Sequence, residues 1–311
     1  MTPPTAAPHP PITTAALLGL GAIGTLYAAH ITARHSDTLR VIADPARIAR
    51  YRAAPPTLNG RPLHLNYVTP DNPGPPADLI LIATKTADLP AIIPSVAPFL
   101  APRTQILPLL NGISAQDILA DAFGRDRVLH GFVQCSSSMR QGHDVIQRGG
   151  DKIVFGEARN TPPAPRVQAV SDYFTRCAIR HEIPADMVAA QWRKFILNVG
   201  INQAQAVLRA PCRRLHEDPE AMQLARNLMD EAAQVAQALG IPDALSIPAW
   251  AADIILKAGP DDKTSMLQDV EAGRRTEVDW FAGAVSRLGR HHGIPTPAND
   301  LVLRLLARPA T

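Results

Sequence analysis

The sequence has few cysteines and no long hydrophobic run. Its three cysteines, Cys135, Cys177 and Cys212, are far apart, a spacing that fits neither a disulfide framework nor a zinc cluster. No window reaches the roughly 20 apolar residues that a membrane-spanning helix needs. We therefore expect a protein of a reducing, cytoplasmic compartment that is not inserted into a membrane.

Runs of like charge and two hydrolase motifs are also missing. The net charge is +3, but no stretch of Lys and Arg indicates nucleic-acid binding, and the mild basic excess suits a small anionic ligand. None of the 10 histidines shows H-x-x-x-H spacing, which argues against a metal hydrolase. The lack of a G-x-S-x-G elbow argues against serine hydrolysis. We predict no metal site and no nucleic-acid partner.

The segment Ala15–Ala29 carries the most informative motif. A short apolar run leads into G-x-G-x-x-G and then into a helix-forming stretch, which is the context that a dinucleotide site requires. The first glycine permits a tight turn, the second lets the backbone approach the pyrophosphate, and the third lets helix and strand pack closely. The helix N-terminus then offers N–H groups to the phosphates. The predicted cofactor-binding turn comprises Gly19, Leu20, Gly21, Ala22, Ile23 and Gly24.

Continuous apolar runs separated by helical stretches indicate a parallel sheet that is covered on both faces. The predicted strands after the glycine turn are Leu39–Ala43, Leu79–Ala83 and Thr104–Leu110, with shorter segments at Val128–Gln134, Asp144–Gln147, Lys152–Gly156 and Ala178–Ile183. Helical periodicity dominates from Asp186 onward. We therefore predict a disordered Pro- and Thr-rich tail (residues 1–13), an α/β Rossmann-type domain with a doubly wound parallel sheet (14–185) and an all-helical domain (186–311).

Polar residues follow two of the predicted strands. Lys85 comes two positions after one apolar run, and Asn111-Gly112 follows another. Ligands of open parallel sheets bind outside the carboxyl ends of the strands. However, Asn-Gly is also an ordinary turn, and the residues alone leave both interpretations open.

The segment Met187–Leu208 predicts a largely buried helix with one polar stripe. Lys194, Asn198 and Asn202 recur at every fourth position and form a narrow row. Buried amide and ammonium groups need partners. The stripe therefore binds a polar ligand in a cleft, or it belongs to a hydrogen-bond network between helices.

Two residues near the C-terminus have ordinary structural interpretations. Ser265 followed by Gln268 matches the capping box at the start of a helix. Glu277 lies close to Arg274 and Arg275, which is typical of a surface ion pair.

These motifs, in this order, resemble the ketopantoate reductase (2-dehydropantoate 2-reductase) family. The matching segments are G-L-G-A-I-G at Gly19–Gly24, Lys85, Asn111-Gly112, W-R-K-F-I-L-N-V-G-I-N at Trp192–Asn202, S-M-L-Q-D-V…R-T-E-V-D at Ser265–Asp279, and H-G-I-P-T-P at His292–Pro297. The resemblance spans nearly the whole chain. It implies a Rossmann domain followed by an all-helical domain, with the active site in the cleft between them.

The resemblance also implies a reaction, the NAD(P)H-dependent reduction of a 2-oxo acid, most directly 2-dehydropantoate to pantoate in pantothenate biosynthesis. It makes Lys194 the proton donor. The implied substrate ligands are Asn111, Asn198, Asn202 and Ser265, and the further cofactor-side groups are Lys85, Asn111, Ser138 and Glu277. The residue types suit this chemistry, because the developing alkoxide needs a cation or proton donor within hydrogen-bond reach.

The sequence departs from the family pattern at three positions. Asp44 stands where the family has a basic residue for the 2′-phosphate, and an acid there favours the free ribose of NAD(H). Arg47 and Arg50 follow and can bind a phosphate, so NADP(H) is the expected cofactor, with NAD(H) as the alternative. Cys212 and Asp262 stand where family members carry substrate-facing Asn, which makes the substrate less certain than the reaction.

Two other functions stay open. One is the same chemistry on a different branched 2-oxo acid. The other is a regulatory protein that binds NAD(P) without turnover, although a sensor has no need for Lys194 beside two carboxamides. A homodimer is compatible with the sequence.

Overall fold

The computed structural model describes residues 9–307, apart from the side chains of residues 135–137. The chain divides into two compact units, Met1–Met187 and Val188–Thr311. Residues 1–8 of the expected tail lie outside the described residues. Ile12 is fully buried, and the backbone N–H and the hydroxyl of Thr13 both donate to Asp78 at 2.8 Å. These two residues therefore belong to the folded unit rather than to a tail.

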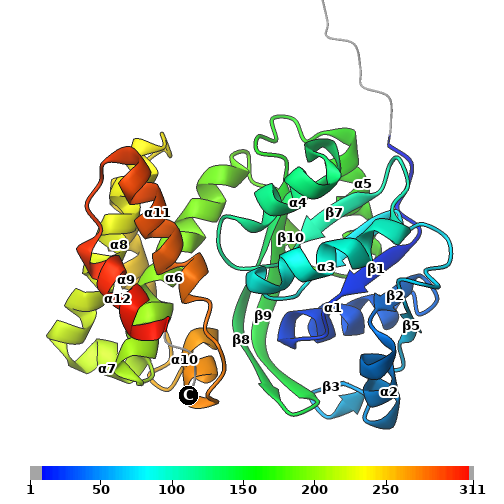
Figure 1. Ribbon diagram of the computed structural model, residues 1–311, viewed down its shortest axis with the longest axis horizontal. Helices are drawn as coiled ribbons and strands as arrows, with labels where there is room; N and C mark the ends of the chain where they lie inside the picture. Colours follow the sequence, from blue (N-terminus) through cyan, green and yellow to red (C-terminus); the bar gives the residue numbers. More distant parts are fainter. Residues whose placement is uncertain (1–8, 308–311) are drawn as a thin grey trace, which may run out of the picture. The chain divides into compact units, whose positions relative to one another are not determined.

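The first unit is built on a five-stranded parallel sheet (Figure 1). Each predicted strand forms because a short apolar run can be buried on both faces, and β1 pairs in parallel with β2 on one side and β6 on the other. The strand order is β5 (Asn66–Val68), β2 (Leu39–Ile42), β1 (Ala15–Leu18), β6 (Leu79–Ile82) and β7 (Gln105–Pro108). The prediction of a Rossmann-type α/β fold is confirmed.

Helices cover both faces of this sheet. Helices α1 (Ala22–Thr32) and α5 (Pro165–Arg176) pack on one face, where Tyr27 and Phe174 meet alternate residues of the strands. Helices α3 (Leu89–Val96) and α4 (Ala115–Phe123) pack on the other face together with Phe99. Alternate side chains of each strand therefore enter separate cores.

A second sheet differs from the prediction. In place of three short segments, β8 (His130–Gln141) and β9 (Asp144–Gly156) form a long antiparallel hairpin. A register shift between Cys135 and Ser137 and a positive φ of 75° at Gly149 let the two strands continue through a glycine-containing stretch. The predicted Ala178–Ile183 segment contributes only a short strand. The other elements of this sheet are β3 (Thr57–Leu58), β4 (Arg61–Pro62) and β10 (His181–Glu182), and helix α2 (Pro45–Ala53) follows β2.

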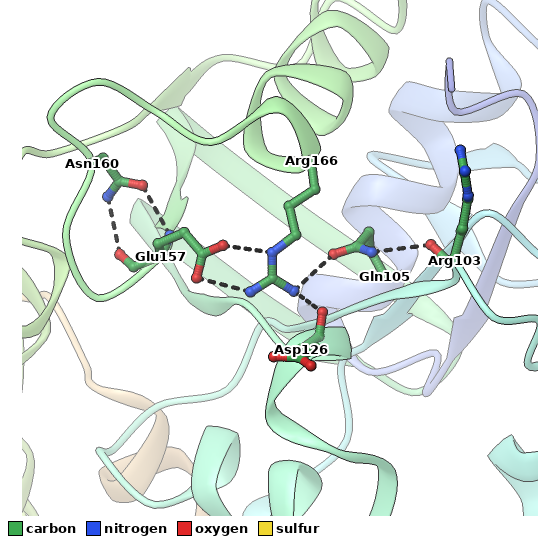
Figure 2. Close-up of polar contacts among 6 residues, drawn as sticks. All are labelled: Arg103, Gln105, Asp126, Glu157, Asn160 and Arg166. Atoms are coloured by element: carbon green, nitrogen blue, oxygen red, sulfur yellow. Dashed lines mark hydrogen bonds and ion pairs between the residues drawn. The ribbon is translucent and has the colours of Figure 1, made fainter. Parts of the chain in front are cut away.

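Figure 2 shows a polar network that fastens α5 to the amino-terminal end of β7. The guanidinium of Arg166 binds both carboxylate oxygens of Glu157 (Nε–Oε1 2.5 Å, Nη2–Oε2 2.8 Å). It also donates to Gln105 Oε1 at 3.1 Å and to the backbone carbonyl of Asp126. Asn160 in turn bonds the backbone of Glu157. The network lies at the end of the sheet opposite to the ligand-binding end, so its role is structural.

Every element in the described part of the second unit is helical. The α-helices are α6 (Met187–Leu208), α7 (Cys212–Glu217), α8 (Pro219–Ala238), α9 (Ile247–Lys257), α10 (Ser265–Glu271), α11 (Ala282–His292) and α12 (Pro297–Leu306). Helices α6 and α8 pack closely at Gly200, where an added Cβ would lie 2.5 Å from Met229 Cγ.

A buried carboxylate on α8 caps the start of α12. Glu231 accepts hydrogen bonds from the backbone N–H groups of Ala298 (2.7 Å) and Asn299 (2.9 Å) and from the side-chain amide of Asn299 (2.8 Å). The first-turn N–H groups of a helix have no partner within the helix. Glu231 therefore satisfies donors that would otherwise be buried without one.

We expect Glu231→Ala to lower the free energy of unfolding by about 3 kcal/mol, because it removes a charged acceptor and leaves buried donors unsatisfied. The measurement is urea denaturation followed by circular dichroism. Glu220→Ala is the matched control, since Glu220 lies exposed in the first turn of the same helix, and it should cost less than about 1 kcal/mol. Equal losses in both variants would contradict the capping role.

Candidate active site

The glycine turn between β1 and α1 has the geometry of a dinucleotide-binding turn. Gly19 has a φ of +100°, and an added Cβ would lie 2.6 Å from the carbonyl oxygen of Ala83. At Gly24 a Cβ would lie 1.8 Å from the carbonyl oxygen of Gly19. At Gly21, in contrast, the nearest atom is 4.0 Å away. Two glycines are thus required by packing, while the middle glycine faces space that a ligand could enter.

This contrast predicts different results for two similar substitutions. Gly24→Ala should destabilise the first unit, because its methyl group overlaps the backbone of Gly19. Gly21→Ala should fold with little change in thermal stability but raise the dissociation constant of NADPH and NADH about tenfold, because the methyl group would take space that we expect the pyrophosphate to fill. Thermal melts and fluorescence titrations measure the two effects. Unchanged affinity in Gly21→Ala would mean that the ligand does not approach this backbone.

Lys85 and Asn111 lie at the same carboxyl-terminal end of the sheet as the glycine turn. Lys85 is half-buried at the start of a 3₁₀ turn (Thr86–Asp88) that follows β6. The hydroxyl of Thr86 lies 3.4 Å from the backbone carbonyl of Asn111, so the loops after β6 and β7 are neighbours. The first unit therefore brings together the predicted residues from the ends of β1, β6 and β7.

Asp44 is the N-cap of α2. Its Oδ1 atom accepts a hydrogen bond from the backbone N–H of Arg47 at 2.7 Å, and its Oδ2 atom lies 3.3 Å from Arg47 Nε. Both side chains are more than half exposed. Asp44, which favours NAD(H), and Arg47, which favours NADP(H), are therefore paired with each other.

Arg140 reaches the glycine turn from β8, and Ser138 lies two positions before it on the same strand. Arg140 Nη1 donates to the backbone carbonyl of Leu20 at 3.0 Å. The Ser138 hydroxyl oxygen is buried and makes no hydrogen bond within residues 9–307. The sequence alone indicates no role for Arg140, because a contact between residues 120 positions apart leaves no local signal.

Helix α6 separates its polar side chains into two groups. Asn198 and Asn202 are 7% and 6% exposed, and their side chains make no hydrogen bond with any of the described residues. Buried carboxamides almost always have a partner. Lys194 lies half-buried in the same row. These two amides are therefore available to a ligand.

The second group forms the network between helices that the sequence analysis left open. Gln203 donates to Asn299 Oδ1 at 3.2 Å and accepts from the backbone N–H of Ala282 at 2.8 Å. Gln205 accepts from the backbone N–H of Thr264 at 2.8 Å. The network thus involves Gln203 and Gln205 rather than the predicted row of Lys194, Asn198 and Asn202.

The capping-box interpretation of Ser265 is wrong. Thr264 is the N-cap of α10, and its hydroxyl accepts from the N–H of Leu267 at 3.5 Å. Ser265 is the first helical residue and is exposed. Because both residues are good N-caps, the sequence does not distinguish them. The hydroxyl of Ser265 is consequently not needed to begin the helix.

Glu277 is half-buried and precedes a 3₁₀ turn (Val278–Trp280). Of its two neighbouring arginines, Arg274 lies 2.8 Å from Asp269 and Arg275 lies 3.0 Å from Asp279.

Two of the three departures from the family pattern, Cys212 and Asp262, have partners within the second unit. Cys212 Sγ accepts from Gln205 Nε2 at 3.1 Å, and burial, with Asp262 nearby, raises the pKa of the Cys212 thiol to about 11. The carboxylate of Asp262 accepts from the backbone N–H of Gly259 at 2.8 Å. Cys212 is therefore an uncharged, buried group, and the Asp262 carboxylate is engaged by its own loop.

Residues 9–307 contain no cluster of three or more His, Cys, Asp or Glu side chains arranged to hold a metal ion. None of the helices in this described part is long and apolar enough to cross a membrane.

A Rossmann-type unit with an open glycine turn, followed by a helical unit with a Lys-Asn-Asn row, defines a dinucleotide-dependent oxidoreductase. Comparison with family models identifies which one. The model described as "Ketopantoate reductase PanE/ApbA" matches residues 15–160, and its C-terminal counterpart matches residues 186–310. The chain belongs to the ketopantoate reductase family.

Individual relatives agree with this assignment. A 2-dehydropantoate 2-reductase of Caulobacter vibrioides is 26% identical over 296 residues, which cover 95% of this chain and 98% of the relative. A D-mandelate dehydrogenase solved with NADH and anilino(oxo)acetate shares the fold at a TM-score of 0.86 and 21% identity, covering 96% of this chain and 98% of that one. A dimeric ketopantoate reductase from Staphylococcus aureus has a TM-score of 0.80 at 23% identity, covering 94% and 97%.

Proposed function

We propose that this protein reduces a 2-oxo acid with NAD(P)H, and that 2-dehydropantoate is the substrate and pantoate the product. One observation carries the proposal. Asn198 and Asn202 are 7% and 6% exposed, make no side-chain hydrogen bond with the described residues, and lie in one row with Lys194. Two carboxamides and an ammonium group can bind the hydroxyl, carboxylate and carbonyl oxygens of such an acid.

The cofactor fits the first unit. A Cβ added at Gly21 would come no closer than 4.0 Å to Ala83 O, which supports placing the pyrophosphate there, and the N-terminus of α1 would add N–H groups and a partial positive charge. Residues 19–24 would hold the phosphates, Asp44 or Arg47 the adenosine ribose, and Lys85, Asn111, Ser138 and Glu277 the remaining part of the cofactor. When bound, the reduced nicotinamide supplies a hydride to C2 of the substrate.

The protein's own residues hold the acid and complete the reduction. Asn111, Asn198, Asn202 and Ser265 bind and orient the substrate. Lys194 Nζ would give a proton to the C2 oxygen of the substrate as negative charge develops on that oxygen. An ammonium donor stabilises the developing negative charge and removes it by proton transfer. The product is the 2-hydroxy acid.

The direct test is to mix the purified protein with 2-dehydropantoate and NADPH or NADH and to follow the absorbance of the reduced cofactor. We expect substrate-dependent oxidation of NADPH, with NADH as the alternative. No oxidation with either cofactor would refute the proposal, and binding of a cofactor without turnover would favour a regulatory NAD(P)-binding protein.

A second candidate is the NADH-dependent reduction of a different branched 2-oxo acid. The pairing of Asp44 with Arg47 favours it, because an arginine held by a carboxylate is a weaker phosphate ligand. The D-mandelate dehydrogenase with the same fold was solved with NADH. A panel of branched 2-oxo acids assayed with both cofactors separates the two candidates, since a higher kcat/KM on another acid would replace 2-dehydropantoate.

We also propose that the protein acts in pantothenate biosynthesis as a homodimer. The dimeric Staphylococcus aureus reductase supports the second part. Light scattering coupled to size-exclusion chromatography measures the mass in solution, and the mass of a single 33.4 kDa chain would refute the dimer.

A further inference from the structure

Arg140 joins the hairpin of the second sheet to the glycine turn. Its Nε atom donates to the backbone carbonyl of Gly142 at 2.9 Å, and its Nη1 atom donates to the carbonyl of Leu20 at 3.0 Å. Gly142 lies just beyond β8, with a φ of +64°. The guanidinium is planar, so two bonds from different nitrogens fix its orientation.

The bond to Leu20, which is shorter than the 3.5 Å contact of the Thr25 hydroxyl with the same carbonyl, helps to fix the direction of the next N–H group. The carbonyl of Leu20 and the N–H of Gly21 belong to one trans peptide, in which the two groups point in opposite directions. When Arg140 holds the carbonyl on one side, the N–H of Gly21 points to the other side. Gly21 is the N-cap of α1, where N–H groups are not used by the helix itself.

The positive charge of Arg140 is not matched by a carboxylate. Both of its acceptors are backbone carbonyls, and among residues 9–307 no ion pair includes it. Its side chain is exposed. A full positive charge therefore lies on the Leu20 carbonyl side of this peptide and attracts an anion bound at the turn across a distance over which salt screens the attraction.

We propose that Arg140 is a positioning residue for the cofactor pyrophosphate: it fixes the Leu20–Gly21 peptide and adds a positive charge beside it. This inference rests on the proposed function, because it assumes that the glycine turn binds a dinucleotide. It assigns to the β8–β9 hairpin a part in cofactor binding that the glycine motif does not reveal.

The test is to measure the dissociation constants of NADPH and NADH for Arg140→Ala at several salt concentrations. We expect both constants to rise about tenfold at low salt, and the dependence of affinity on salt to become weaker, since one screened attraction is lost. A purely structural role would leave the salt dependence unchanged. Arg140→Lys keeps the charge but cannot hold both carbonyls in one plane. Its affinity for the cofactors should therefore lie between those of the unaltered protein and Arg140→Ala.

Arg103→Ala is the matched control, since Arg103 is exposed in the same unit but precedes β7, at the other end of the sheet. It should bind both cofactors like the unaltered protein. Three results would overturn the inference: unchanged affinity in Arg140→Ala, an equal loss in Arg103→Ala, or full affinity in Arg140→Lys. If the unaltered protein binds neither cofactor, the proposed function itself fails, which is a different outcome.

Discussion

Replacing Lys194 with alanine should lower kcat by about 10²–10⁴-fold, the range typical for removal of a general acid. The dissociation constants of NADPH and NADH should not change, because the residues proposed to bind the pyrophosphate lie in the first unit. Stopped-flow absorbance measures turnover, and fluorescence titration measures cofactor binding. The expected pattern is therefore intact binding with almost no reduction of the 2-oxo acid.

A second variant separates proton donation from charge. Lys194→Arg keeps a cation, but an arginine side chain, with a pKa above about 12, does not give up its proton. It should also lose most of its turnover if the proton comes from this position. Lys257→Ala is the control, because Lys257 is an exposed lysine in the last turn of α9. Turnover of Lys194→Ala within about tenfold of the unaltered protein would show that another group donates the proton.

Replacing Asp44 with asparagine should shift the ratio of kcat/KM for NADPH over NADH upward by about a hundredfold. We expect kcat/KM to rise about tenfold for NADPH and to fall about tenfold for NADH. The change removes a negative charge close to the 2′-phosphate and releases Arg47 from its ion pair. It also weakens the acceptor that a carboxylate offers to the free ribose hydroxyl of NADH.

Asparagine is chosen because it retains the N-cap of α2. Its side-chain oxygen can accept from the N–H of Arg47 as Asp44 does at 2.7 Å, and Asn and Asp are similarly good caps. Asp121→Asn, in an exposed part of α4, is the control and should leave the ratio unchanged. A ratio that stays constant in Asp44→Asn would mean that the adenosine ribose does not contact this position.

The sheet of the first unit could be predicted because its signals are local. The strands β1, β6 and β7 are continuous apolar runs, and helical periodicity marks the second unit. The row of Lys194, Asn198 and Asn202 also follows from spacing alone. These patterns need no knowledge of which segments meet in the folded chain.

Other features depend on contacts between distant segments. The hairpin of β8 and β9 forms because the two strands pair through a register shift, which neither strand encodes by itself. The sulfur of Cys212 accepts from Gln205, so a residue compared with a substrate ligand has a structural partner instead. Thr264 and Ser265 are equivalent as caps in the sequence, and only the backbone places the helix start between them.

Helix α6 carries both the Lys194 row and the two glutamines that bind later segments, so natural variants of those segments must be interpreted with care. Gln203 and Gln205 tie the carboxyl-terminal half of this helix to segments up to 96 positions later in the chain. These bonds resist rotation of the helix about its own axis, and the direction of the Lys194 row depends on that rotation. If the Lys194 row binds the substrate as proposed, substitutions at Asn299 should alter activity through this helix, so loss of activity there would not be evidence of contact with the substrate.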